Sequence, residues 1–98
     1  MNDDAVRAQL ESFRASIDNL DAALLHILAE RFNVTRKVGA FKSEVGLPSA
    51  DRARELRQIE RLRALGAEAG LNPDFAEALM ELIFAEVVAN HDAIRDAN

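Results

Sequence analysis

Basic side chains inside an apolar helical pattern are the feature of this sequence that could do chemistry. Arg31 stands where the pattern calls for an apolar residue, three residues after Leu28. Arg14 follows the apolar Phe13 directly, and Lys42 lies eleven residues beyond Arg31. A guanidinium or ammonium group within an apolar surface is costly unless an anion meets it. The sequence therefore predicts a buried site for an anionic ligand.

The spacing of these cations suggests how they could meet that anion. Arg31, Val38 and Lys42 are seven and four residues apart, so they share one stripe of a helix. Arg31 and Lys42 would be about 16 Å apart along the axis, and long side chains would have to converge on one ligand. Arg14 lies about 260° around the helix from Arg31, so we expect it to serve a pocket in a partner subunit. Ordinary surface cations with snorkelling or ion-paired side chains are the alternative.

Further charged groups follow in the second half of the chain. Asp51, Arg54 and Glu55 are spaced to share one helical face, although a solvated face with ion pairs is the ordinary interpretation of such spacing. His91 and Glu86 interrupt an apolar stretch, where a lone histidine is usually a core or edge residue. We expect the other basic residues nearby to be solvated charges: Arg52, Arg57, Arg61 and Arg63.

The element that must carry the first cations is a long helix, predicted from about Asp4 to about Glu44. Its apolar residues recur at alternating spacings of three and four, which is typical of one continuous amphipathic helix. Such a helix would be roughly 60 Å long, whereas a compact chain of this size has a radius of gyration of about 13 Å. We therefore expect it to pack against a second copy in an intertwined homodimer. Gly39 within it indicates close packing or mere tolerance of glycine.

Two more helices are predicted. The segment 45–48 contains Gly and Pro and should break the first helix, after which Ser49 is a plausible N-cap. Gly66 or Gly70 should end the second helix, and residues 72–74 read as N-cap, N1 and N2 of a third. No alternating run resembles a strand. The sequence thus predicts an all-α, three-helix protomer with a single domain over residues 1–98.

Composition excludes several classes of function. The chain of 98 residues has no Cys and only two His, so we expect no disulfide, no thiolate nucleophile and no metal site. The net charge of −5 makes nucleic acid a poor partner. There is no apolar run of transmembrane length and no signal-peptide pattern, so we expect no membrane partner and a cytoplasmic location.

Taken together, the motifs resemble a known family. The string Arg14-x-x-Ile17-Asp18-x-Leu20-Asp21-x-x-Leu24, continuing to Arg31, is similar to the opening of the all-helical (AroQ-class) chorismate mutases. The resemblance continues through Val38-Gly39-x-x-Lys42 and through Asp51-x-x-Arg54-Glu55, and it covers essentially the whole chain.

The resemblance implies an isomerase of aromatic amino acid biosynthesis that converts chorismate to prephenate by a Claisen rearrangement. The reaction is unimolecular, so catalysis would consist of positioning and electrostatic stabilisation in a homodimer without a cofactor. Arg31 and Arg14 of the partner subunit would bind the two carboxylates of the substrate. Lys42 would reach a carboxylate and the ether oxygen, and Arg54 would support the carboxylate end.

The remaining contacts implied by the resemblance involve all three helices. Glu55 would accept a hydrogen bond from the substrate hydroxyl, assisted by the backbone at Asp51. The ring would be walled by Val38, Phe84 and Val88. Two positions depart from the family pattern: His91 stands where a Gln often contacts the ether oxygen, and Val87 where a small hydroxyl residue often sits. We expect His91 to donate its ring N–H to that oxygen and Val87 to line the site.

Three other interpretations remain open at this point. Isochorismate–pyruvate lyase is a related reaction on the same scaffold, although the Asp51-x-x-Arg54-Glu55 group is more typical of a mutase. A non-catalytic helical dimerisation or regulatory module, or a plain helical adaptor, would have no use for the buried Arg31. Allosteric regulation and docking to a second enzyme are not determined by the sequence.

Overall fold

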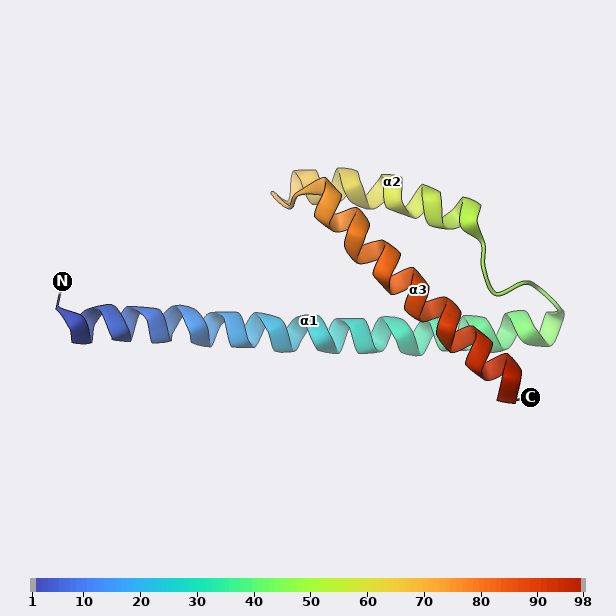
Figure 1. The fold of residues 1–98 in the computed structure, drawn as a ribbon, viewed down its shortest axis with the longest axis horizontal. Helices are drawn as coiled ribbons and strands as arrows, with labels where there is room; N and C mark the ends of the chain where they lie inside the picture. The colour runs from blue at the N-terminus through green and yellow to red at the C-terminus, as the bar shows by residue number, and fades with distance from the viewer. Residues whose placement is uncertain (1, 98) are drawn as a thin grey trace. The chain divides into compact units, whose positions relative to one another are not determined.

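A computed structural model describes residues 2–97 of the chain, and these residues form three helices. They are α1 (Asp3–Val45), α2 (Arg52–Glu68) and α3 (Pro73–Ala97), shown in Figure 1. The all-α class, the number of helices and the long first helix are confirmed. The structure divides into two compact units, one ending at Asn33 and the other beginning at Val34, so α1 runs through both.

A glycine closes α1, as the sequence predicts. Gly46 has a φ of 79°, a left-handed conformation that glycine adopts without steric cost. The turn lets the Leu47 backbone N–H donate to the Lys42 carbonyl oxygen at 2.8 Å, which satisfies a carbonyl group at the helix end. The break at residues 45–48 is therefore confirmed.

The predicted N-cap of the second helix is wrong. Ser49 lies three residues before the first helical residue, and the N-cap is Asp51, whose carboxylate accepts from the Arg54 backbone N–H at 3.1 Å. A carboxylate at this place satisfies a free amide of the first turn and also interacts favourably with the helix dipole. With Ser49 as the cap, Asp51 would instead have stood inside the first turn.

The other end of α2 is formed by Gly70 and not by Gly66. Gly70 has a φ of 81°, and the Leu71 N–H reaches back to the Gly66 carbonyl oxygen at 2.7 Å. Gly66 stays within the helix and is buried, where an added Cβ would lie 3.4 Å from the Ala76 side chain. The start of α3 is confirmed, since Asn72 Oδ1 accepts from the Asp74 N–H at 2.8 Å.

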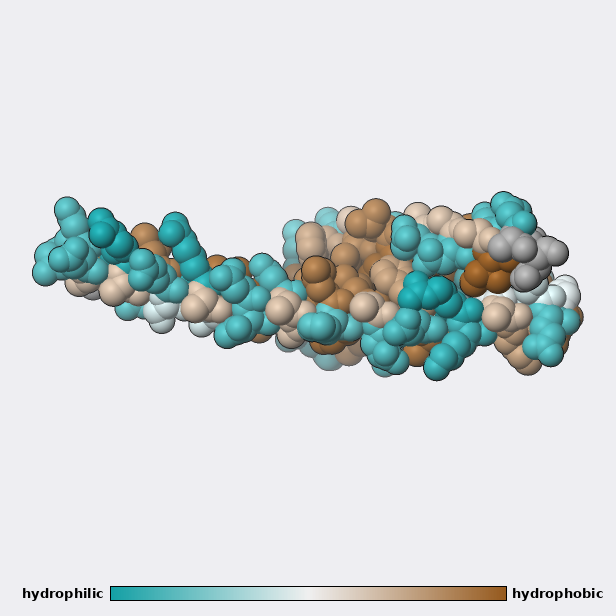
Figure 2. Space-filling view, turned by 90° about the horizontal axis from the view of Figure 1, so that it is seen from below, coloured by the Kyte–Doolittle hydropathy of each residue, from teal (hydrophilic) through white to brown (hydrophobic). Residues whose placement is uncertain are grey.

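The N-terminal unit is a single helical stretch whose apolar residues are at the surface. Leu20 is 69% exposed and Ile27 is 67% exposed. Figure 2 shows apolar residues interspersed with hydrophilic ones along this stretch. The remaining large apolar residues of the unit that are exposed are Val6, Leu10, Phe13, Ile17, Leu24 and Leu25. The stripe predicted from the sequence is therefore present, and nothing within the unit covers it.

The C-terminal unit has its own core, because α2 and α3 form a helical hairpin. Its buried apolar residues are Ile59, Ala76, Met80, Ile83 and Phe84. Arg63, expected to be a solvated charge, forms ion pairs across the hairpin: its Nη1 lies 3.0 Å from carboxylate oxygens of Asp74 and Glu77. These carboxylates, Asp74 foremost, raise the pKa of Arg63 above its ordinary value. Within residues 2–97, no helix combines the length and apolarity needed to cross a bilayer.

Candidate active site

The two arginines predicted to bind carboxylates lie in the N-terminal unit. Arg14 is exposed and Arg31 is half-buried. Seventeen residues of continuous helix separate them, or about 25 Å along the axis. Their side chains therefore start too far apart to hold one small dianion within a single chain.

The last turns of α1, in the C-terminal unit, carry Lys42 and Val38. Lys42 is half-buried and Val38 is 42% exposed, and the two lie one turn apart on the same face. Gly39, between them in sequence, is buried. The close packing at Gly39 that the sequence left open is confirmed, since an added Cβ would lie only 2.3 Å from Cδ2 of His91.

The start of α2 holds the charged group Asp51, Arg54 and Glu55. Asp51 caps the helix through its side chain, and Arg54 is exposed. Glu55 is half-buried, and its Oε1 lies 3.0 Å from Nη1 of Arg52. The charged face is thus present, with one of its members already in an ion pair.

Arg52 is a residue that the sequence reasoning missed. The same Nη1 atom that meets Glu55 also lies 3.0 Å from Oε1 of Glu81 on α3. Hydrogen bonds from Glu55 first and Glu81 second raise the pKa of Arg52 above its ordinary value. The spacing of Arg52 and Glu55 is visible in the sequence. The contact with Glu81 is not, because it depends on how α2 and α3 are aligned.

The predicted third-helix residues all lie in the second half of α3. Phe84 is buried, whereas Val87 and Val88 are half-buried and so available as walls of a site. His91 is buried, with 6% of its surface exposed. Its Nε2 lies 2.9 Å from the Thr35 carbonyl oxygen, and its Nδ1 lies 3.4 Å from the Ser49 carbonyl oxygen.

The structure brings some of these residues together and leaves others apart. His91 meets the last turns of α1 and the segment before α2, and Glu55 meets Arg52. Among residues 2–97, no hydrogen bond or ion pair links the side chains of Lys42, Arg54 and Glu55 to one another. Lys42 on α1 and the charged pair of positions Arg54 and Glu55 on α2 are not paired with one another, which suits a ligand that carries the complementary charges.

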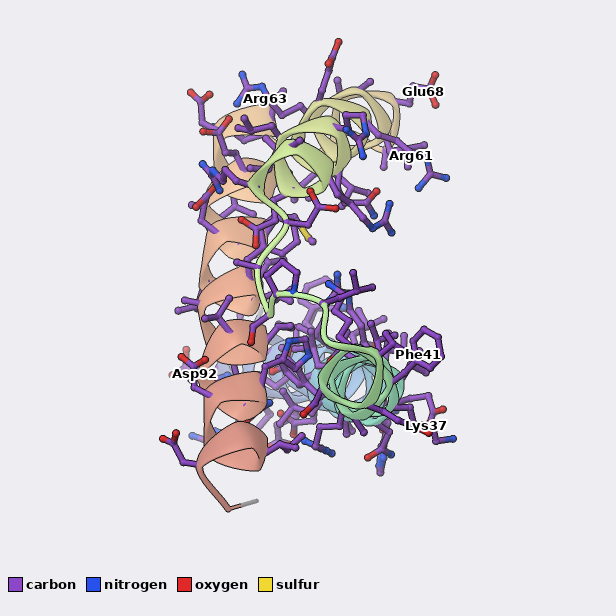
Figure 3. The ribbon with its side chains drawn as sticks, turned by 90° about the vertical axis from the view of Figure 1, so that its right-hand side faces the viewer. Lys37, Phe41, Arg61, Arg63, Glu68 and Asp92 are labelled. Carbon is purple, nitrogen blue, oxygen red and sulfur yellow. The ribbon has the colours of Figure 1, made fainter. Side chains whose placement is uncertain are left out.

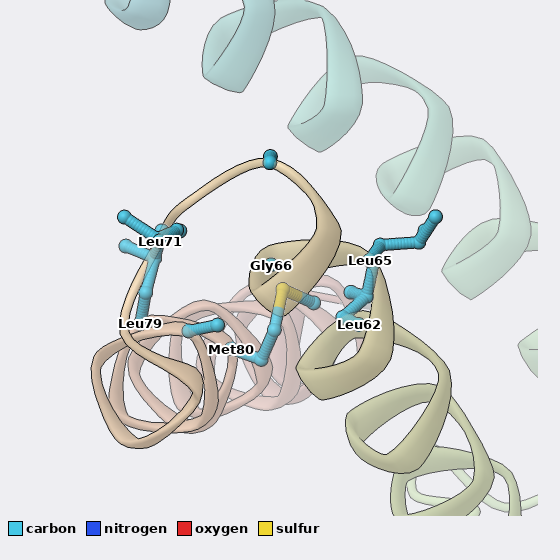
Figure 4. Close-up of a pocket in the computed structure, with 8 residues that line it drawn as sticks. Leu62, Leu65, Gly66, Leu71, Leu79 and Met80 are labelled. Carbon is cyan, nitrogen blue, oxygen red and sulfur yellow. The ribbon is translucent and has the colours of Figure 1, made fainter.

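A separate hollow between α2 and α3 does not suit that ligand. It has a volume of about 280 Å³ and is shown in Figure 4. Its lining is apolar throughout: Leu62, Leu65, Gly66, Ala69, Leu71, Ala76, Leu79 and Met80. An anion there would lose its hydration without gaining a cation, so the hollow is no candidate for the site.

Known proteins resemble this chain over most of its length. A family model described as chorismate mutase type II matches residues 13–92. The T-protein of Haemophilus influenzae is 30% identical over 85% of this chain, which spans only 22% of that relative. The chorismate mutase of Methanocaldococcus jannaschii is 27% identical, with 76% of each chain covered.

A further relative has a different substrate in its name. The 4-amino-4-deoxychorismate mutase of Streptomyces venezuelae is 27% identical, with 88% of this chain and 84% of the relative covered. The matched region of the family model contains every predicted site residue, from Arg14 to His91. The chain belongs to the chorismate mutase type II family.

Proposed function

We propose that this protein converts chorismate to prephenate. The observation that carries the proposal is the match of the family model over residues 13–92, a range that contains Arg14, Arg31, Lys42, Arg54 and Glu55. The substrate is a dianion, which fits a site whose charged side chains are mainly cations. In the rearrangement an ether C–O bond breaks while a C–C bond forms within one molecule. No nucleophile or external proton is required.

These side chains would bind the charged groups of the substrate and hold it in position for the reaction. Arg31 and Arg14 of the partner subunit bind the two carboxylates, because the planar guanidinium group donates two parallel hydrogen bonds to a carboxylate. This fixes the substrate in the compact conformation from which the rearrangement proceeds. Val38, Phe84, Val87 and Val88 line the ring.

Lys42 and Glu55 would act at opposite parts of the substrate. Lys42 donates to the ether oxygen, where negative charge develops as the C–O bond breaks. Glu55 accepts a hydrogen bond from the ring hydroxyl, with the α2 start capped by Asp51 and Arg54 supporting the carboxylate end. The ion pair of Glu55 with Arg52 supports this role, because it holds the carboxylate in place at the start of α2.

We further propose that the active form is an intertwined homodimer. The stripe on residues 3–33 exposes Leu20, Leu24 and Ile27, and isolated helices are marginally stable in water. A second copy of the stripe is an apolar surface of matching length. The dimer would also bring Arg14 of the partner subunit within reach of a site whose own Arg14 lies about 25 Å from Arg31.

A second candidate substrate is 4-amino-4-deoxychorismate. The match covers 84% of the relative named for this substrate, whereas it covers 22% of the T-protein. The substrates differ where an amino group replaces the hydroxyl, and a carboxylate such as Glu55 accepts hydrogen bonds from either group. The family pattern alone therefore does not separate the two substrates.

The test is an assay of purified protein with chorismate, 4-amino-4-deoxychorismate and isochorismate, with each product identified by mass spectrometry. We expect prephenate from chorismate and a kcat/KM at least tenfold lower with the other two. Release of pyruvate from isochorismate at a higher kcat/KM would instead identify a lyase. If none of the three is consumed, and none raises the melting temperature, the chain is a non-catalytic module.

A further inference from the structure

His91 joins three segments of the C-terminal unit at one buried point. Its ring is on α3, its Nε2 lies 2.9 Å from the Thr35 carbonyl oxygen on α1, and its Nδ1 lies 3.4 Å from the Ser49 carbonyl oxygen before α2. Both neighbours are acceptors, so the ring can only donate to them. A neutral ring donates to one of the two, and the shorter distance favours Nε2–H as that donor.

Gly39 supplies the space for this ring. A Cβ at Gly39 would lie 2.3 Å from Cδ2 and 2.7 Å from Nε2 of His91, so no other residue fits without displacing the ring. Figure 3 shows Lys37 and Phe41, on either side of Gly39, pointing away from α3, and Asp92 pointing away from α1. At this point α1 and α3 are therefore in contact through the ring of His91, which packs directly on the backbone of Gly39.

The segments that meet at His91 are the ones that carry site residues. Thr35 and Gly39 belong to the turns of α1 that carry Val38 and Lys42. Ser49 lies two residues before Asp51, the cap of the helix that carries Glu55. A displacement of the His91 ring would thus change where Lys42 stands relative to the start of α2.

We propose that His91 is a positioning residue, which holds Lys42 against the substrate through its contacts with Thr35 and Gly39. The proposal rests on the mutase function proposed above. It differs from the contact with the ether oxygen that the sequence suggests, because both ring nitrogens face backbone carbonyl oxygens, those of Thr35 and Ser49. Lys42 is then the group that serves the ether oxygen.

The first experiment tests the contact and needs no activity. Melting temperatures are measured for the wild type, Gly39→Ala, His91→Ala and the double variant. Gly39→Ala should lower the melting temperature by roughly 5–15 °C, because the overpacked ring must move. In the His91→Ala background the same change should lower it by less than about 2 °C, since alanine favours a helix and the ring is gone.

Gly66→Ala is the matched control for that experiment. Gly66 is also a buried helical glycine, but its added Cβ would meet its nearest neighbour at 3.4 Å. We expect this change to leave the melting temperature nearly unaltered with or without His91. A Gly39→Ala protein that melts like the wild type would overturn the proposal.

The second experiment separates positioning from direct contact by kinetics. His91→Ala should lower kcat by about 10- to 100-fold with a smaller change in KM, because a displaced donor weakens the transition state more than binding. If His91 acts through Lys42, adding His91→Ala to Lys42→Ala should lower kcat by less than about threefold further. If the decreases in kcat of the two single variants multiply in the double variant, the proposal is overturned and direct contact of His91 with the substrate is favoured.

Two more variants complete the test. His91→Gln keeps an N–H donor that can reach the Thr35 carbonyl oxygen and should recover most of kcat, provided that Lys42 is present. Met80→Ala removes a buried side chain of the hairpin and should lower the melting temperature without changing kcat. A fall in melting temperature without a fall in kcat for His91→Ala would reduce His91 to a structural residue and overturn the proposal.

Failure of this proposal is distinguishable from failure of the mutase function. A wild type that does not convert chorismate overturns both the function and the positioning role, whereas the melting cycle still reports on the contact of His91 with Gly39. An active wild type without coupling between Gly39 and His91, or between His91 and Lys42, overturns the positioning role alone.

Discussion

The two units of this chain reach a folded state by different routes. In the C-terminal unit, α2 and α3 cover Ile59, Ile83 and Phe84 with their own residues. In the N-terminal unit, Leu20 and Ile27 are more than 60% exposed, on a helix that has no second layer within its unit. The comparison teaches that the C-terminal unit covers its own core, whereas the apolar stripe of the N-terminal unit would be covered only in the proposed dimer. Arg14 and Arg31, the predicted ligands of the substrate carboxylates, both lie in the N-terminal unit.

The largest effect should come from a charge on the exposed stripe. Leu24→Glu places a carboxylate in the proposed dimer interface, and an uncompensated buried charge costs about 3–5 kcal/mol. We expect the variant to lose dimerisation, much of its helical content and its activity together. Sedimentation equilibrium and circular dichroism at the same protein concentration measure these losses.

Ala22→Glu is the control for that prediction, because it introduces the same charge about 200° around the helix from Leu24. It should remain dimeric and active. If the two variants have the same oligomeric state and activity, the stripe is not the dimer interface, and the proposed difference between the two units is wrong.

The next effect concerns a site assembled across two chains. Arg14→Ala and Arg31→Ala should each lower kcat by about 100- to 1,000-fold, because each leaves a substrate carboxylate poorly paired. Refolding the two variants together should restore about a quarter of wild-type activity, since half of random dimers are mixed and each has one intact site. The measurement is the rate of chorismate consumption after mixing.

Each variant refolded alone through the same procedure controls for nonspecific recovery. If mixed dimers are demonstrated by mass spectrometry but their activity stays at the level of the parents, Arg14 acts within its own chain. The N-terminal unit would then complete its site without the partner.

A smaller effect is expected where the hairpin turns. Gly70→Ala forces a residue with a Cβ into a left-handed conformation, at a cost of about 1–2 kcal/mol. Urea denaturation should show this loss, whereas Gly70→Asn should lose less because Asn tolerates the conformation better. Equal stability of all three proteins would mean that the turn can take another shape.

The smallest effect should come from the ion pairs of Arg63. Arg63→Ala removes exposed pairs with Asp74 and Glu77, which water and salt screen, so the melting temperature should fall by less than for Gly70→Ala. The fall should shrink further in 1 M salt. Arg61→Ala is the control, because Arg61 points away from α3 (Figure 3). A larger loss for Arg61 would contradict this account of the hairpin.

Local signals explain which parts of the fold the sequence could predict. The three helices follow from the period of the apolar residues and from caps that act within a few residues, such as Asn72 before α3 and Gly46 after α1. The errors have the same origin. Ser49 and Asp51 are both good caps, and the sequence does not reveal which residue the helix begins after.

The site was harder to predict, because its contacts depend on the alignment of distant elements. The residue types and spacings of Lys42, Asp51, Arg54 and Glu55 are visible in the sequence and carried the family resemblance. Arg52 pairs with Glu81, which lies 29 positions further along the chain. His91 packs on Gly39, which lies 52 positions before it. No pattern within one helix encodes such a pairing.

The order of the helices along the chain also determines which apolar residues of a newly made chain are exposed first. A ribosome releases α1 first, with its apolar stripe and no second layer to cover it. The hairpin of α2 and α3, which covers its own core, is made after α1. If the proposed dimer is the active form, every newly made chain passes through an interval in which the apolar stripe of α1 is complete but uncovered, and that interval ends only when a second chain binds. The rate at which this protein becomes functional should accordingly depend on how many copies are being made side by side.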